Sequence, residues 1–151
     1  MAEPFRYLLR VRYAECDAQG IVFNARWGDY IDVAATEFQR AVFASVDPAV
    51  IGMDWQLVKQ TIEWRAPARY DDVLEIRVHT ERVGTTSFTL VSEFRRYASG
   101  AILARGETTY VVVDLAQRRK RPVTADERAR FERGAPGCVI DHAGAGGSAI
   151  S

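Results

Sequence analysis

The chain opens with a regular alternation of apolar and basic residues over positions 5 to 13. Apolar side chains at every second position share one face of a β-strand, so this pattern predicts a first strand with one buried face. The predicted buried positions are Phe5, Tyr7, Leu9, Val11 and Tyr13, and Arg6, Arg10 and Arg12 are expected on the opposite face.

A helical period follows the first strand. Apolar residues recur at intervals of three or four at Trp27, Ile31, Ala34, Phe38 and Val42. This spacing predicts an amphipathic helix of about five turns, which should end before Asp47-Pro48 because proline disfavours helix in the residue that precedes it. We expect Asn24 to cap its start. A glycine in the first turn is unfavourable, so we expect something to pack closely against Gly28.

The remaining chain reverts to the period of a strand. Segments 55–65, 73–80, 87–97 and 101–114 predict four strands. Short connections make sequential strands antiparallel neighbours. A single long helix against such a sheet is an α+β arrangement, the hotdog fold, here with one helix wrapped by a five-stranded antiparallel sheet.

The C-terminal region divides into two parts. Residues 124–133 predict a short helix capped by Thr124, with Glu127 completing a capping box. We therefore expect one domain over residues 1–133. Residues 134–151 are rich in glycine and alanine, and we expect a disordered tail there.

Composition limits the classes of partner. Twenty basic and twenty acidic residues cancel in a chain of 151 residues, so no overall field attracts nucleic acid. No apolar run approaches the roughly 20 residues that span a bilayer, and no signal-peptide core is visible. We expect a cytoplasmic protein without membrane insertion. The distant Cys16 and Cys138 predict neither a disulfide nor a metal site.

The sequence lacks the motifs that several kinds of catalysis require. The only histidines are His79, in a predicted strand, and His142, in the tail, and HExxH, CxxC and GxSxG are missing. The phosphate-binding glycine patterns are missing too, so we expect no metal and no cofactor. Cys16 has no histidine to activate it and is a poor candidate nucleophile. The basic run 118–121 is interpreted as a solvated turn in preference to an anion site.

Asp17 lies in a loop just before the predicted helix. The composition of "DAQG" favours an aspartate that accepts hydrogen bonds from its own turn. The alternative is catalytic: the first amides of a helix can hold a carbonyl oxygen, and Gly20 lets the loop bring the carboxylate toward it. A carboxylate facing a polarised carbonyl is the pairing that acyl transfer needs.

Three segments carry a family resemblance: "VRYAECDAQGIVFNARWGDYID", "WRAPARYDDVLEI" and "GTTSF". They resemble the hotdog-fold acyl-CoA thioesterases of the 4-hydroxybenzoyl-CoA thioesterase family, including its Tol-Pal-associated branch, from about residue 6 to about residue 131. The most specific part is Asp-x-x-Gly-[Ile/Val]-Val, here Asp17, Gly20, Ile21 and Val22.

The resemblance implies hydrolysis of an acyl-CoA with an aromatic or short acyl group. Asp17 is then the nucleophile or the base for water, and amides near Gly20 and Asn24 hold the thioester oxygen. Family members are homodimers or homotetramers, as dimers of dimers, with the acyl pocket between subunits.

Other positions are implied to bind substrate. Asn24 stands where relatives often have tyrosine or histidine, and Trp27 where tyrosine is common, so the acyl pocket differs in polarity and width. Relatives in the aromatic-acyl branch have basic residues before "SF". This chain has Gly84, Thr85 and Thr86 there, so other cations must hold the CoA phosphates. The candidates for substrate contact are Phe23, Trp27, Arg65, Arg82, Thr85 and Ser87, with Arg69 and the 118–121 run as further cations.

Two alternatives remain open at the level of sequence. The protein binds an acyl thioester or another small hydrophobic ligand without turnover, or it acts on acyl groups attached to a carrier protein. Hotdog branches that depend on a loop histidine, the dehydratases and the His-Gly-Gly thioesterases, are excluded because this loop has none.

Overall fold

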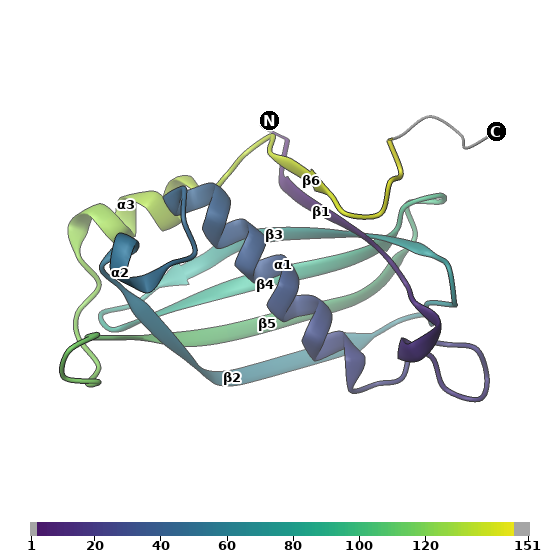
Figure 1. Cartoon of the computed structure of the whole chain (residues 1–151), viewed down its shortest axis with the longest axis horizontal. Coiled ribbons are helices and arrows are strands. Elements are labelled where there is room, and N and C mark those ends of the chain that lie inside the picture. The colour runs from purple at the N-terminus through teal and green to yellow at the C-terminus, as the bar shows by residue number, and fades with distance from the viewer. Residues whose placement is uncertain (1–2, 147–151) are drawn as a thin grey trace.

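The computed structural model describes residues 3–146 as one mixed sheet crossed by a long helix (Figure 1). The strands are β1 (Phe5–Arg10), β2 (Asp54–Trp64), β3 (Val73–Val83), β4 (Ser87–Arg96), β5 (Ile102–Val113) and β6 (Val139–Asp141). The helices are the 3₁₀ turn η1 (Tyr13–Glu15), α1 (Arg26–Phe43), α2 (Pro48–Ile51) and α3 (Ala125–Arg133). This is the α+β arrangement of one long helix against a sheet that the sequence predicts.

The sheet differs from the prediction at one edge. Its order is β2-β5-β4-β3-β1-β6, and β6 runs parallel to β1 while the other neighbours are antiparallel. The expected five antiparallel strands are therefore six in a mixed sheet. The sixth strand comes from residues 134–151, which were expected to be disordered. That expectation was wrong for Val139–Asp141, and residues 147–151 lie outside the described part. Backbone bonds to the β1 edge hold β6, and composition does not predict such bonds.

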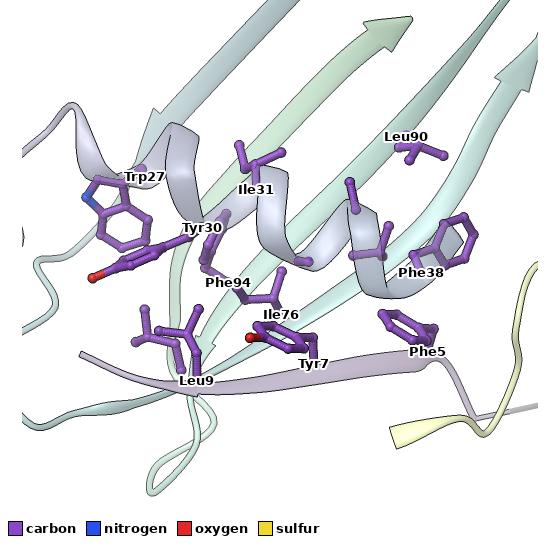
Figure 2. Packing of buried hydrophobic residues seen from close by; sticks show 14 of the residues in the cluster. Phe5, Tyr7, Leu9, Trp27, Tyr30, Ile31, Phe38, Ile76, Leu90 and Phe94 are labelled. Carbon is purple, nitrogen blue, oxygen red and sulfur yellow. The ribbon is translucent and has the colours of Figure 1, made fainter. Parts of the chain in front are cut away.

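The buried face of α1 confirms the predicted helix. Trp27, Ile31, Ala34, Phe38 and Val42 are all buried, and α1 lies diagonally across the concave face of the sheet (Figure 1). Figure 2 shows Trp27 and Tyr30 of the helix turned toward Phe94 of β4, and Phe38 facing Phe5 of β1. The core therefore lies between one helix and one sheet face.

Both ends of α1 are informative. The helix ends at Phe43, and Ala44 adopts a left-handed conformation with φ 61°, so it stops before Asp47-Pro48 as predicted. The expected close contact at Gly28 is also present: a Cβ there would lie 3.3 Å from Gln60 Oε1 of β2. The start of α1 is thereby placed against the outermost strand.

Tyr13 is not part of the first strand. The predicted strand extended to residue 13, but β1 ends at Arg10, and Tyr13 lies in η1 with 80% of its surface exposed. The cause is Glu15, whose Oε1 accepts the Arg12 N–H at 2.8 Å and turns the chain out of the sheet. The alternating pattern continues past the residue at which the strand ends.

The short terminal helix α3 is confirmed together with its cap. Thr124 Oγ1 accepts the Glu127 N–H at 3.1 Å, and Glu127 Oε1 accepts the Thr124 N–H at 2.9 Å. Within residues 3–146, none of the helices has the length and apolar character to cross a bilayer.

Candidate active site

The loop of residues 16–22 folds back on itself. Cys16 and Val22 form an isolated antiparallel bridge, and the Asp17 N–H donates to the Ile21 carbonyl at 2.8 Å. Gly20 makes the turn with φ +75°, and a Cβ there would meet nothing within 4 Å. Glycine is therefore favoured by its backbone conformation and not by a lack of space.

The Asp17 carboxylate is exposed and partly held by this turn. Its Oδ1 accepts the Gln19 N–H at 2.8 Å and the Ile21 N–H at 3.4 Å. This is the local turn arrangement that composition favours. Oδ2 has no protein partner among residues 3–146. The carboxylate is thus oriented through one oxygen while the other is available to a substrate or a water.

A pocket of about 420 Å³ surrounds this carboxylate. Apart from Asp17, it is lined by Tyr13, Cys16, Ala18, Gly20 and Tyr70. The sequence did not predict either tyrosine as a site residue: Tyr13 was assigned to the buried face of the strand, and Tyr70 was included only as part of "PARYDD". The sequence signal that could have identified Tyr70 as a site residue was this "PARYDD" turn, which adjoins the Asp17 loop.

Cys16 lies in the same pocket but is a poor nucleophile. Burial raises the pKa of its thiol, and the negative charge of Asp17 raises it further. The thiol therefore stays protonated near neutral pH, and the thiolate is the reactive form.

The start of α1 is not capped as predicted. We expected Asn24 as the cap, but the cap residue is Ala25, without a side-chain hydrogen bond. Backbone carbonyls take the first amides instead: Phe23 O accepts the Arg26 N–H at 2.9 Å, and Asn24 O accepts the Trp27 N–H at 3.4 Å. Within the described residues, the N–H groups of Asn24 and Ala25 donate to no protein oxygen. They lie at the positive end of the helix dipole, where a carbonyl oxygen is favourably bound.

Glu15 fixes the relation between η1 and α1. It is only 6% exposed, and its carboxylate accepts the Tyr30 hydroxyl at 3.0 Å and Arg12 Nη2 at 2.7 Å. Its carbonyl accepts the Phe23 N–H at 2.9 Å. One residue therefore ties both sides of the Asp17 loop to the helix.

Trp27 belongs to the core. It is 2% exposed, and its ring packs edge-to-face on Phe94 at a centroid distance of 5.0 Å. The structure therefore does not bring it to the pocket, whereas Phe23, three residues before α1, is 52% exposed.

The remaining residues that were predicted to contact substrate lie at opposite ends of the sheet. Arg65 and Arg69 lie in the segment after β2, and Ile21 bridges to Arg69, so this segment adjoins the Asp17 loop. Arg82, Thr85 and Ser87 lie around the β3–β4 turn, at the other end of β3. Eleven residues of β3 separate the ends by about 35 Å, so one chain does not bring the two sets together.

The cations distant from Asp17 differ in their surroundings. Arg82 lines a hollow of about 340 Å³ with Glu81, Thr89 and Glu107. In the 118–121 run, Arg121 binds both carboxylate oxygens of Glu127 at 2.9 and 2.8 Å. Arg121 therefore has a structural role between the end of β5 and α3.

Comparisons with known proteins agree with the fold. The model of the thioesterase-like superfamily matches residues 11–131. The acyl-CoA thioester hydrolase YbgC of Escherichia coli is 29% identical over 130 residues, 85% of this chain and 96% of that protein. A solved gentisyl-coenzyme A thioesterase is 25% identical with a TM-score of 0.72, over 83% of this chain and 98% of that one. A 1,4-dihydroxy-2-naphthoyl-CoA thioesterase from Synechocystis shares the fold, with a TM-score of 0.74 at 23% identity over 84% and 94% of the two chains. The chain belongs to the thioesterase-like superfamily and is a thioester hydrolase.

Proposed function

We propose that the protein hydrolyses an acyl-CoA to the free acid and CoA, with Asp17 as the catalytic carboxylate. The observation that carries the proposal is the oriented Asp17 carboxylate, exposed in an open pocket in the loop that leads to α1, together with the N–H groups of Asn24 and Ala25, which have no protein acceptor among residues 3–146. Similarity to an acyl-CoA thioester hydrolase supports the CoA ester as substrate. The Asp17–Val22 segment supports placement in the 4-hydroxybenzoyl-CoA thioesterase family.

The start of α1 supplies the hydrogen-bond donors that the reaction needs. The N–H groups of Asn24 and Ala25 are placed to donate to the thioester oxygen, on which negative charge grows as the carbonyl carbon is attacked. Donors aimed at a developing oxyanion are among the largest contributions to acyl-transfer rates. Phe23, which directly precedes these residues in the chain, is 52% exposed and is the proposed acyl contact.

Two routes are consistent with this arrangement. In one, Asp17 Oδ2 attacks the carbonyl carbon, the C–S bond breaks, CoA leaves as a thiolate that takes a proton from solvent, and water hydrolyses the mixed anhydride. In the other, Asp17 takes a proton from water as the water attacks, and the departing thiolate recovers that proton. A single turnover in ¹⁸O-water tests the anhydride route: label inside the Asp17 carboxylate requires the anhydride. Label only in the released acid fits both the base route and attack of water on the acyl carbon of the anhydride.

We propose further that the working unit is at least a homodimer formed through β2. This strand is the open edge of the sheet, 11 residues long, with Leu57, Val58 and Trp64 about half exposed. A long uncovered apolar edge is prone to pair with another strand. Antiparallel pairing of two β2 edges about a two-fold axis brings the β3–β4 turn of one copy, with Arg82, Thr85 and Ser87, to the end that carries Asp17 in the other.

Thiol release from a panel of acyl-CoAs tests the function. The panel contains benzoyl, phenylacetyl, short and long straight-chain esters, and we expect kcat/KM of about 10⁴ M⁻¹s⁻¹ or more for an aromatic or short acyl group. Saturable binding without thiol release from any ester would contradict hydrolysis and indicate a binding protein. A carrier-protein ester that outcompetes the CoA ester would overturn the choice of CoA.

A further inference from the structure

The loop that carries Asp17 is closed at its base by backbone hydrogen bonds. The Asp17 N–H donates to the Ile21 carbonyl at 2.8 Å, and the Phe23 N–H donates to the Glu15 carbonyl at 2.9 Å. Asn24 follows Phe23 directly, so the bond to Glu15 joins the first arm of the loop to the residues whose amides are proposed to hold the thioester oxygen. The position of Asp17 relative to those amides therefore depends on where Glu15 is held.

The Glu15 carboxylate receives hydrogen bonds from two directions. Oε2 accepts Nε and Nη2 of Arg12 at 3.1 and 2.7 Å, and Oε1 accepts the Arg12 N–H at 2.8 Å. Arg12 lies three residues earlier on the same segment, so these bonds shape η1 and do not reach α1. Among residues 3–146, the donor to this carboxylate from α1 is the Tyr30 hydroxyl, at 3.0 Å from Oε1.

Tyr30 is a well-placed donor. Its ring is buried and lies edge-to-face with Trp27, with centroids 6.0 Å apart, so packing fixes the direction of the hydroxyl (Figure 2). Burial, together with the negative charge of Glu15, raises the pKa of this hydroxyl, which therefore stays protonated at neutral pH. The amides of Asn24 and Ala25 stand at the start of the same helix. One element thus carries both the donor to Glu15 and the proposed donors to the thioester oxygen.

A buried carboxylate is a costly way to pack a loop against a helix. Taking the Glu15 charge out of water opposes folding, and a well-packed apolar pair is often at least as stable as a buried ionic group. Hydrogen bonds to a carboxylate have directions that apolar contacts lack, so a fully satisfied network favours one arrangement of the loop. The Glu15 network is therefore better explained by the placement of Asp17 than by stability.

We infer that Tyr30 is a positioning residue for hydrolysis, whose hydroxyl, through Glu15, fixes Asp17 relative to the amides of Asn24 and Ala25. This role rests on the proposed function of Asp17. Tyr30 is buried and does not line the Asp17 pocket, so it acts on the reaction through Glu15. Loss of the hydroxyl should leave substrate binding intact and weaken the alignment of carboxylate and oxyanion donors, which counts in the transition state.

Tyr30→Phe removes the hydroxyl and keeps the ring. In thiol release from the best acyl-CoA of the panel, we expect kcat to fall about tenfold while KM stays within about twofold. In hydrogen exchange followed by NMR, the Phe23 amide should lose protection about fivefold or more, because its bond to the Glu15 carbonyl opens more often.

Tyr7→Phe is the matched control. Tyr7 and Tyr30 are both 3% exposed, and the Tyr7 hydroxyl lies 2.9 Å from His142 Nδ1, so this change also removes one hydrogen bond of a buried tyrosine. Tyr7 is in β1 and does not contact Glu15 by a hydrogen bond within the described residues. The variant should match the parent in kcat, in KM and in the protection of the Phe23 amide.

Three results would overturn the positioning role. A purely structural role for Tyr30 predicts a lower free energy of unfolding with an unchanged kcat of the folded protein, and a role in binding predicts a higher KM with unchanged kcat. A slower Tyr30→Phe whose Phe23 amide keeps its protection would exclude the route through Glu15. An active parent with equal kcat in Tyr30→Phe overturns the positioning role alone, whereas a parent that releases no thiol from any ester contradicts the proposed function and the positioning role together.

Discussion

At the scale of single residues, Glu15 has the most demanding environment around the site. Burial by itself raises the pKa of its carboxyl, but the hydrogen bonds from Arg12 and Tyr30 outweigh burial, and the pKa is held below its usual 4.5. A folded-state pKa below the unfolded one stabilises the fold above about pH 4.5, and this stabilisation is lost as the pH falls through the folded value. Glu15 should therefore contribute at neutral pH and little in strong acid.

Glu15→Gln tests this linkage. We expect the free energy of unfolding in urea to fall by about 2 kcal/mol at pH 7, because charge-assisted hydrogen bonds are replaced by neutral ones and the Tyr30 hydroxyl loses its best acceptor. At pH 3 the difference from the parent should largely vanish. Glu132→Gln, an exposed carboxyl on α3, should change stability little at either pH, and an equal loss for Glu15→Gln at both pH values would contradict the assignment.

Cys16 gives a second test at this scale. Because burial and the neighbouring Asp17 raise the pKa of its thiol, Cys16→Ser should keep kcat/KM for the best acyl-CoA within about threefold. A loss near 100-fold in the thiol-release assay would instead make the thiol the nucleophile.

At the scale of elements, α1 lies close to β5 because position 106 has no side chain. A Cβ on Gly106 would lie 2.6 Å from Ile31 Cδ1. This glycine therefore sets the distance between α1 and the sheet.

Gly106→Ala should lower the free energy of unfolding by about 1–2 kcal/mol through overpacking. Because the contacted atom is the tip of a side chain, Ile31→Val removes it and should recover part of the loss when combined with Gly106→Ala. Urea unfolding of both single variants and the double variant measures the coupling. Additive losses would show that the strain lies elsewhere.

At the scale of the whole molecule, the two sheet edges differ. The β1 edge is covered by β6, whereas β2 is open and carries exposed apolar residues. This asymmetry is the basis for the proposed β2 dimer, which places substrate contacts from two copies around each Asp17.

Like charges on the β2 edge should separate the two copies. We expect Leu57→Glu combined with Val58→Glu to halve the mass in sedimentation and to reduce thioesterase activity, with unchanged circular dichroism. Val50→Glu, on exposed α2, is the control and should keep both mass and activity. An unchanged mass with full activity for the β2 variant would exclude this interface.

The sequence predicts those features that depend on periodicity. The helix face and the capped α3 are confirmed because burial and capping leave regular spacings along the chain. Tyr13, Asn24 and β6 were misassigned because their structure depends on particular hydrogen bonds: Glu15 to Arg12, carbonyls at the helix start, and the backbone of the β1 edge. Trp27 was assigned to the substrate pocket because a buried aromatic and a pocket aromatic look alike in sequence.

The central claim is that Asp17 carries the chemistry, and the kcat of Asp17→Asn tests it most directly. Asp71→Asn is the matched control, since Asp71 is also exposed, lies beside Tyr70 and adopts φ 69°, which asparagine tolerates. On the best acyl-CoA of the panel, Asp17→Asn should lower kcat by about 100-fold or more with little change in KM, and Asp71→Asn should match the parent. Equal kcat for the parent and Asp17→Asn would contradict the account.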